Sequence, residues 1–147
     1  MAAPTRVEEA TEPFEGLAEA VGRLVGHLSA SAAAPSRARV EEIIRSPASR
    51  LLIARDAGGT IVGMLTLVLF SIPTGVRAWI EDVVVEPACR GGGIGVALIE
   101  AALALAHEQG ARTVDLTSRP GREGANRLYR RLGFVQRDTN VYRFEQR

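Results

Sequence analysis

The sequence contains no lysine, a single cysteine and few aromatic residues. All 18 residues in its combined lysine and arginine count are arginine, which excludes Schiff-base lysines, lysine general bases and phosphate loops that need a lysine. Cys89 alone cannot form an internal disulfide or a multi-cysteine zinc site, so a reducing compartment is expected. Neither His27 nor His107 has a second ligand at metal spacing, and we therefore expect no metal site.

Long apolar segments are also missing. The least charged stretch, residues 58–76, contains glycines and a proline and falls short of the roughly 20 apolar residues of a membrane span. The first residues lack the basic segment and the apolar run of a secretion signal. We therefore expect no membrane segment and a cytoplasmic location.

The composition is otherwise ordinary. The 147 residues are 46% hydrophobic and 24% charged, close to an average soluble protein, which predicts one domain over residues 1–147. A net charge of +1 argues against nucleic-acid binding. The charge is uneven, however, because residues 1–89 hold 8 arginines against 11 acids and residues 90–147 hold 10 against 6. The excess of positive charge in residues 90–147 bears on function only if this part of the chain contains a phosphate site.

The periodicity of apolar residues predicts a mixed α/β fold in an α+β layout. Apolar spacing of three and four residues over 14–28 indicates a helix, and Ser36 can cap a short one that buries Val40, Ile43 and Ile44. An antiparallel meander follows, and then a helix that crosses over to a strand parallel to the last one. The expected strands are residues 51–55, 60–70, 77–85 and 113–117, the expected helices 94–109 and 122–132, and the expected closing strand pair 134–136 and 140–144.

A glycine-rich loop at residues 90–95 separates the third expected strand from the long helix. The spacing G-x-G-x-x-G fails from either Gly91 or Gly93, and the loop G-x-x-x-x-G-K-[ST] fails because the chain has no lysine. What remains is R-x-x-G-x-G, formed by Arg90, Gly93 and Gly95. In this position backbone N–H groups and the positive end of a helix can hold a pyrophosphate.

Residues 80–95, together with Asn-Arg-Leu-Tyr-Arg-Arg-Leu-Gly-Phe at 126–134, resemble the GNAT superfamily of N-acetyltransferases. The resemblance covers residues 50–145. It implies a GNAT-like mixed, mostly antiparallel central sheet with a splayed parallel strand pair, flanked by about four helices. It also implies an acetyl-CoA-dependent N-acetyltransferase that moves an acetyl group to a primary amine of a small molecule or protein by direct transfer in a ternary complex.

The resemblance assigns residues to the cosubstrate acetyl-CoA. The loop is expected to bind the pyrophosphate through main-chain contacts, the preceding strand to pair with the pantetheine arm through its backbone, and the last helix to supply one further contact. These residues are, for the loop, Arg90, Gly91, Gly92, Gly93, Ile94, Gly95 and Val96; for the strand, Val83, Val84 and Val85; and for the helix, Asn126.

The same resemblance suggests catalytic groups. Tyr129, protonated at neutral pH, is the expected general acid for the departing thiolate. Glu81 and Asp82 are adjacent on a strand and therefore face opposite sides, and we favour Glu81 as the base because it has the parity of Val83 and Val85. Asp82 and a water chain remain open alternatives.

The acceptor amine is not specified by the sequence. In the family, acceptor recognition comes from segments that correspond to residues 24–36 and 70–79, and neither contains a dense acidic patch. Family members are often dimers, and an exposed strand near the C-terminus could form such an interface. The alternative function is a non-catalytic acyl-CoA-binding sensor or regulatory module on the same fold.

Overall fold

The computed structural model describes residues 5–147 and divides the chain into two compact units, one ending at Leu116 and the other spanning Thr117–Arg147. The single domain expected from the sequence remains a prediction. The elements of the first unit are β1 (Arg6–Glu9), α1 (Leu17–Leu28), α2 (Arg37–Arg45), β2 (Ser49–Arg55), β3 (Ile61–Ile72), β4 (Gly75–Val85), the 3₁₀ turn η1 (Pro87–Cys89), α3 (Ile94–Glu108) and β5 (Val114–Asp115). The second unit contains α4 (Glu123–Arg131).

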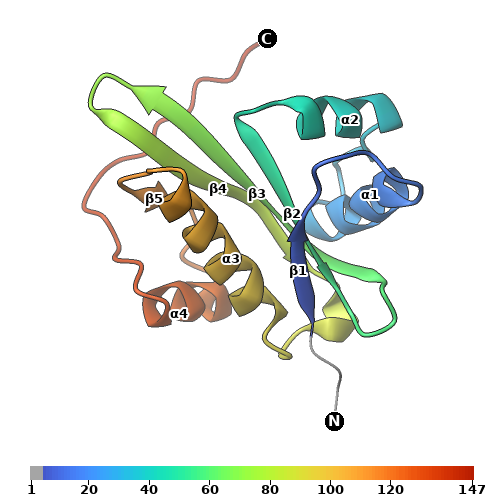
Figure 1. Cartoon of the computed structure of the whole chain (residues 1–147). Coiled ribbons are helices and arrows are strands. Elements are labelled where there is room, and N and C mark those ends of the chain that lie inside the picture. Colours follow the sequence, from blue (N-terminus) through green and yellow to red (C-terminus); the bar gives the residue numbers. More distant parts are fainter. Residues whose placement is uncertain (1–4) are drawn as a thin grey trace. The chain divides into compact units, whose positions relative to one another are not determined.

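The first unit is built on a mixed sheet with the strand order β1-β2-β3-β4-β5 (Figure 1). The β1–β2, β2–β3 and β3–β4 pairs are antiparallel, and β4–β5 is parallel. The parallel pairing is limited to Ala78 with Val114 and Trp79 with Asp115. Beyond Trp79, β4 continues to Val85 without a strand on that side among the described residues. The predicted fold class, including the splayed parallel pair, is confirmed.

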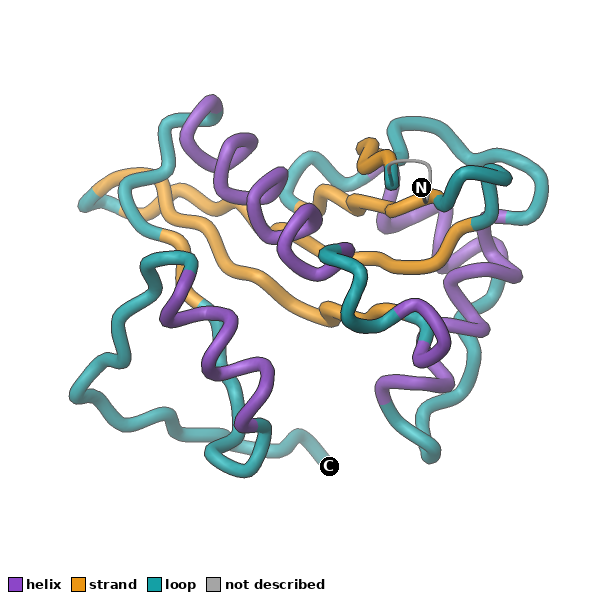
Figure 2. Tube along the Cα trace, turned by 90° about the horizontal axis from the view of Figure 1, so that it is seen from below, coloured by secondary structure: helices purple, strands orange, loops and turns teal. Residues whose placement is uncertain are grey.

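Helices cover both faces of this sheet (Figure 2). On one face, buried residues of α1 and α2 form a core with alternate residues of the strands, among them Ile53, Met64 and Val84. On the other face lies α3, whose buried residues Ile94, Leu98 and Ala102 recur every four residues, as the helical period requires. The sheet is therefore fixed from both sides, as its nearly continuous apolar strands require.

Gly63 on β3 allows α3 to pack closely against the sheet. A Cβ atom at this position would lie 3.1 Å from Leu98 Cδ1, 3.2 Å from Ile94 Cγ2 and 3.2 Å from the carbonyl oxygen of Val84. The two side chains belong to buried residues of α3 and the carbonyl oxygen to the backbone of β4, so an added methyl group would require these neighbours to give by a few tenths of an ångström. Glycine thus favours close packing of α3, the helix that carries the loop described below at its N-terminus.

Replacing Gly63 with alanine is expected to lower the free energy of unfolding by about 1–3 kcal/mol, because the added methyl group overpacks the contact between sheet and helix. Urea unfolding measures the change. The matched control is Gly58→Ala in the β2–β3 turn, where the nearest atom to a Cβ lies at 3.5 Å, an ordinary contact. Equal stability of the Gly63 variant and the native chain would show that α3 can shift without cost.

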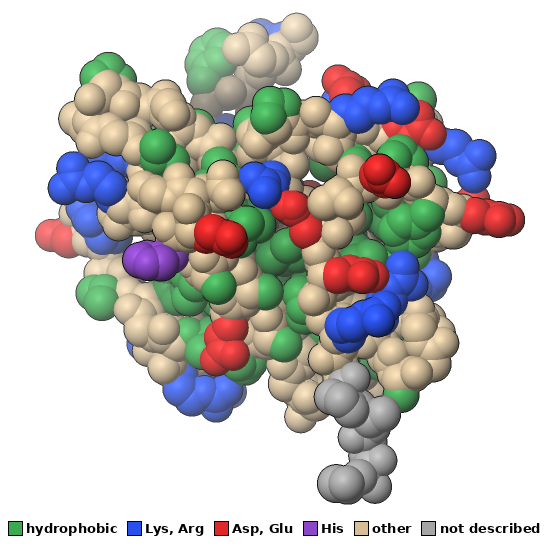
Figure 3. All heavy atoms as spheres, viewed as in Figure 1, with side chains coloured by type: hydrophobic (Ala, Val, Ile, Leu, Met, Phe, Trp, Pro, Cys, Tyr) green, Lys and Arg blue, Asp and Glu red, His purple; other side chains and the backbone are tan. Residues whose placement is uncertain are grey.

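Strand β1 is not predicted by the sequence. Its residues Arg-Val-Glu-Glu contain one apolar side chain and show no apolar alternation. Ion pairs stabilise it instead: Arg50 Nε donates to Glu9 and Arg55 Nε donates to Glu8, in both cases from the neighbouring strand β2. Arginine and acidic side chains are interspersed on the face drawn in Figure 3. Because these partners are about forty residues apart in the chain, local pattern could not reveal them.

The closing strand pair predicted at 134–136 and 140–144 is wrong for this structure. Residues 132–147 form no strand, and Val135, Val141, Tyr142 and Phe144 are largely exposed. Alternation of apolar and polar residues shows which side chains would share a face, but a strand exists only where a partner supplies backbone hydrogen bonds.

Candidate functional site

The glycine-rich loop lies between the end of β4 and the start of α3. It begins with η1 and continues through Arg90 to Gly93, which is the N-cap of α3. Gly91 and Gly93 both have φ = +85°, a left-handed conformation that L-residues with a Cβ adopt only with strain. A Cβ at either position would point into open space, so glycine is needed here for backbone conformation rather than for internal packing.

The backbone N–H groups of residues 91–96 have no protein acceptor within the described part of the chain. The first hydrogen bond that closes α3 runs from Ala97 N to Gly93 O at 3.0 Å. The first N–H groups of any helix lack an internal acceptor, and the helix dipole adds partial positive charge at this end. The loop therefore offers a run of donors suited to an anion such as a phosphate.

Strand β4 contains a bulge at Asp82, three residues before its end at Val85. Thr66 of β3 pairs with Glu81 and Met64 pairs with Val84, so three steps along β4 match two along β3. Asp82 is the extra residue and has φ = +51°, the one positive value among the described non-glycine residues. Aspartate tolerates this conformation better than most residues do. Because of this extra residue, the β4 side chains after the bulge face the opposite side of the sheet from the one that simple alternation predicts.

The parity argument for Glu81 is therefore wrong. Cross-strand partners share a face, so Glu81 lies on the face of Val84 and Met64, which is covered by α1 and α2. Val85 is paired with Gly63 and lies on the α3 face. Asp82 is exposed at the bulge. The sequence contained no signal for the inserted residue, because no glycine marks it.

Glu81 is held by its neighbour on the same face. The indole Nε1 of Trp79 donates a hydrogen bond to Glu81 Oε1 at 2.8 Å. Glu81 is exposed and Trp79 is half-buried. Residues two apart on a strand share a face, so this pair could have been found from the sequence.

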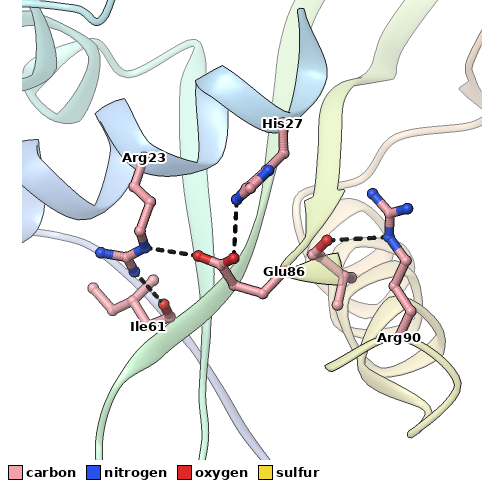
Figure 4. Close-up of polar contacts among 6 residues, drawn as sticks. Arg23, His27, Ile61, Glu86 and Arg90 are labelled. Carbon is pink, nitrogen blue, oxygen red and sulfur yellow. Dashed lines mark hydrogen bonds and ion pairs between the residues drawn. The ribbon is translucent and has the colours of Figure 1, made fainter. Parts of the chain in front are cut away.

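A polar cluster joins α1 to the residue that precedes the loop (Figure 4). Glu86 accepts from Arg23 Nε at 2.7 Å and lies 3.0 Å from His27 Nε2, and Arg23 also donates to the carbonyl oxygen of Ile61 at 2.7 Å. Arg90 Nε donates to the carbonyl oxygen of Val85 at 3.3 Å. The start of the loop is thus tied to α1 and to the end of β4. Sequence reasoning missed this cluster, although Arg23 and His27 are four apart on one helix face.

The hydrogen bond from Arg23 is the main cause that lowers the pKa of Glu86 below its ordinary value of 4.5, and burial acts in the opposite direction. The folded chain therefore binds a proton at Glu86 less readily than the unfolded chain does. By linkage, the stabilisation by Glu86 is present above about pH 4.5 and is lost as the pH falls through the lowered pKa.

Replacing Glu86 with glutamine is expected to lower the free energy of unfolding at neutral pH by about 1–2 kcal/mol, a value reduced for the partial exposure of Arg23. The difference from the native chain should shrink as the pH falls below 4.5. Urea unfolding at several pH values tests this. The control is Glu42→Gln, which removes an exposed pair with Arg39. A difference that stays constant with pH would contradict the role of the charge.

In the second unit, α4 carries the two helix residues singled out from the sequence. Asn126 Nδ2 donates to the carbonyl oxygens of Arg119 at 3.0 Å and Pro120 at 3.5 Å, so its amide orders the segment before α4. The ring of Tyr129 packs edge-on against Phe134 with centroids 5.8 Å apart. Burial raises the pKa of Tyr129 above its ordinary value of 10.0, while Arg122 opposes the change. The phenol is therefore protonated at neutral pH.

Within residues 5–147, no group of three or more histidine, cysteine, aspartate or glutamate residues is placed to hold a metal ion. Among the same residues, none of the helices has the length and apolarity needed to cross a membrane.

Comparison with known proteins identifies the protein family to which this fold belongs. The model of the acetyltransferase (GNAT) family matches residues 23–134. The crystal structure of a Trypanosoma brucei acetyltransferase superposes with a TM-score of 0.79 at 26% identity, covering 97% of this chain and 100% of that one. The fold is thus that of acetyltransferases.

Curated relatives agree with this class. An uncharacterized N-acetyltransferase of Methanocaldococcus jannaschii is 41% identical over 61 residues, which are 42% of this chain and 27% of that protein. The mycothiol acetyltransferase of Propionibacterium freudenreichii subsp. shermanii is 32% identical over 91 residues, 62% of this chain and 29% of that protein. The chain spans less than a third of the length of these curated relatives. Because the family model matches most of the chain, the protein belongs to the GNAT family of acetyltransferases.

Proposed function

We propose that this chain is an acetyl-CoA-dependent N-acetyltransferase that transfers the acetyl group directly to a primary amine, of a small molecule or a protein, in a ternary complex. The observation that carries the proposal is the run of N–H groups at residues 91–96, for which no acceptor is found among residues 5–147. These donors suit the pyrophosphate of the cosubstrate. Substitution of a glycine in this run would place a side chain where the phosphate must approach.

The open side of β4 supports binding of the pantetheine arm. After Trp79 the strand has no neighbour on its β5 side among the described residues. Those backbone groups of Val83, Val84 and Val85 that point to this side are therefore available to an extended ligand, apart from the Val85 carbonyl oxygen, which accepts from Arg90 Nε. An added strand of this kind is recognised by main-chain hydrogen bonds. The side chain of Val84 can pack in the core at the same time.

The chemistry requires a base and an acid. The amine nitrogen attacks the thioester carbonyl carbon, the C–N bond forms, and the C–S bond breaks. Glu81, Asp82 or a water chain removes the proton from the amine, and the Tyr129 phenol gives its proton to the departing thiolate. Glu81 is exposed on the α1 and α2 face of the sheet, and the raised pKa of Tyr129 keeps its proton in place until the thiolate forms.

The test is release of free CoA from acetyl-CoA with a panel of amines, detected with a thiol reagent and checked by mass spectrometry for the acetylated amine. A reaction without amine corrects for Cys89, a partly exposed free thiol. Turnover on at least one amine supports the enzyme. Tight acetyl-CoA binding without turnover on any amine would instead favour the non-catalytic acyl-CoA-binding module, and absence of CoA binding would contradict the loop assignment.

A further inference from the structure

The pair formed by Trp79 and Glu81 leaves one carboxylate oxygen available. Trp79 Nε1 bonds Glu81 Oε1 at 2.8 Å, and no described residue donates to Oε2. Thr66 and Val68 lie opposite these two residues on β3, so both side chains are placed on the α1 and α2 face by regular pairing. The bulge at Asp82 begins directly afterwards. The carboxylate is thus oriented by a fixed donor on its own strand.

The partner of Glu81 differs in charge from the partners of three other glutamates on or next to this sheet. Glu8, Glu9 and Glu86 each accept a hydrogen bond from an arginine guanidinium. The indole N–H is a neutral donor, which orients a carboxylate but does not neutralise it. Among the described residues, Glu81 is thus an exposed carboxylate whose side-chain partner is a neutral donor and not an arginine.

We propose that Trp79 is a positioning residue that holds Glu81 with Oε2 open to the protonated amine of a cationic acceptor. The proposal rests on the proposed acetyltransferase function and specifies its acceptor class. An ammonium group approaching Oε2 gains a charge-assisted hydrogen bond, whereas a guanidinium partner on Glu81 would compete for the same charge. A molecule that presents no ammonium group to Oε2 gains no such bond.

The first experiment does not depend on turnover. Trp79 is the single tryptophan of the chain, so intrinsic fluorescence reports on this pair. The probes are Nα-acetyl-lysine amide, which carries a cationic amine, and its ε-acetylated form, which does not. A saturable emission change with the cationic probe is expected for the native chain and for the control Glu100→Gln, and its loss in Glu81→Gln. An equal response to both probes, or no response in the native chain, would overturn the acceptor class.

The second experiment tests positioning. Trp79→Phe keeps an aromatic ring but removes the N–H donor, and it is expected to lower kcat/KM for cationic amines by about tenfold. In the Glu81→Gln background the same change should have little further effect, because the charge that Trp79 orients is gone. Thermal stability and acetyl-CoA affinity should stay near native values. An equal loss in both backgrounds would show that Trp79 acts only in packing, and a chain inactive on every amine would contradict the proposed function whatever the fluorescence shows.

Discussion

Replacement of Tyr129 by phenylalanine is expected to lower kcat by about 10²-fold or more, the usual range for a lost general acid. The ring remains, so its edge-on contact with Phe134 and most of its burial are retained and stability should change little. The substitution removes the hydroxyl group and with it the proton that the proposed general acid donates. Because burial raises the pKa of this phenol above 10.0, Tyr129 should stay protonated in the native chain through the neutral and mildly alkaline range.

Steady-state kinetics with acetyl-CoA and an accepted amine measure this effect. The matched control is Tyr142→Phe, since Tyr142 is the other tyrosine of the chain and its side chain is exposed. Tyr142→Phe should keep native kcat. If both variants turned over at the native rate, the proton would have to reach the thiolate from another group, and Tyr129 would have only a packing role.

Replacement of Gly93 by valine is expected to raise the dissociation constant of acetyl-CoA by about 10²-fold, equivalent to losing one or two charge-assisted hydrogen bonds. At φ = +85° a β-branched residue is strained, and relief of that strain would turn the N–H groups of the loop away from their common direction. The added side chain would also point into the open space in front of the loop.

Isothermal titration with acetyl-CoA measures the dissociation constant. Gly59→Val is the matched control, since Gly59 has φ = +86°, has nothing within 4 Å of a Cβ position, and lies in the β2–β3 turn. It should lose comparable stability but bind acetyl-CoA normally. Equal affinity in both variants, with both folded, would refute the role of the loop.

Local sequence signals predicted much of the fold. The hairpin turn at Asp56 is an example, because its carboxylate accepts from the N–H groups of Gly58 and Thr60 at 2.9 Å. Ser36 is another, since its hydroxyl accepts from Arg39 N at 3.1 Å and caps α2. Each of these features is fixed by residues within four positions, and the sequence therefore reveals them.

The features that the sequence did not reveal depend on partners far along the chain. Strand β1 is held by ion pairs to β2, and Glu86 is held by α1 more than sixty residues earlier. The bulge at Asp82 depends on pairing with β3 and changed the reasoning for Glu81. For the loop, in contrast, the signal is local: the spacing of Arg90, Gly93 and Gly95 marks it in the sequence, and in the structure Gly93 is the left-handed N-cap of α3 while Gly95 lies inside the helix.

The bulge in β4 also separates residues that act through main-chain atoms from residues that act through side-chain atoms. On our proposal, the residues after Asp82 bind the cosubstrate through main-chain atoms. Every residue type has these atoms, so any apolar residue that fits the core would bind equally well at these positions. The residues before Asp82, Trp79 and Glu81, act through side-chain atoms that a single substitution removes. Substitutions in the half of β4 before Asp82 could therefore change which acceptor is bound without changing the binding of acetyl-CoA by the half after it. A single strand thus keeps the residues that select the acceptor apart from those that bind the cosubstrate.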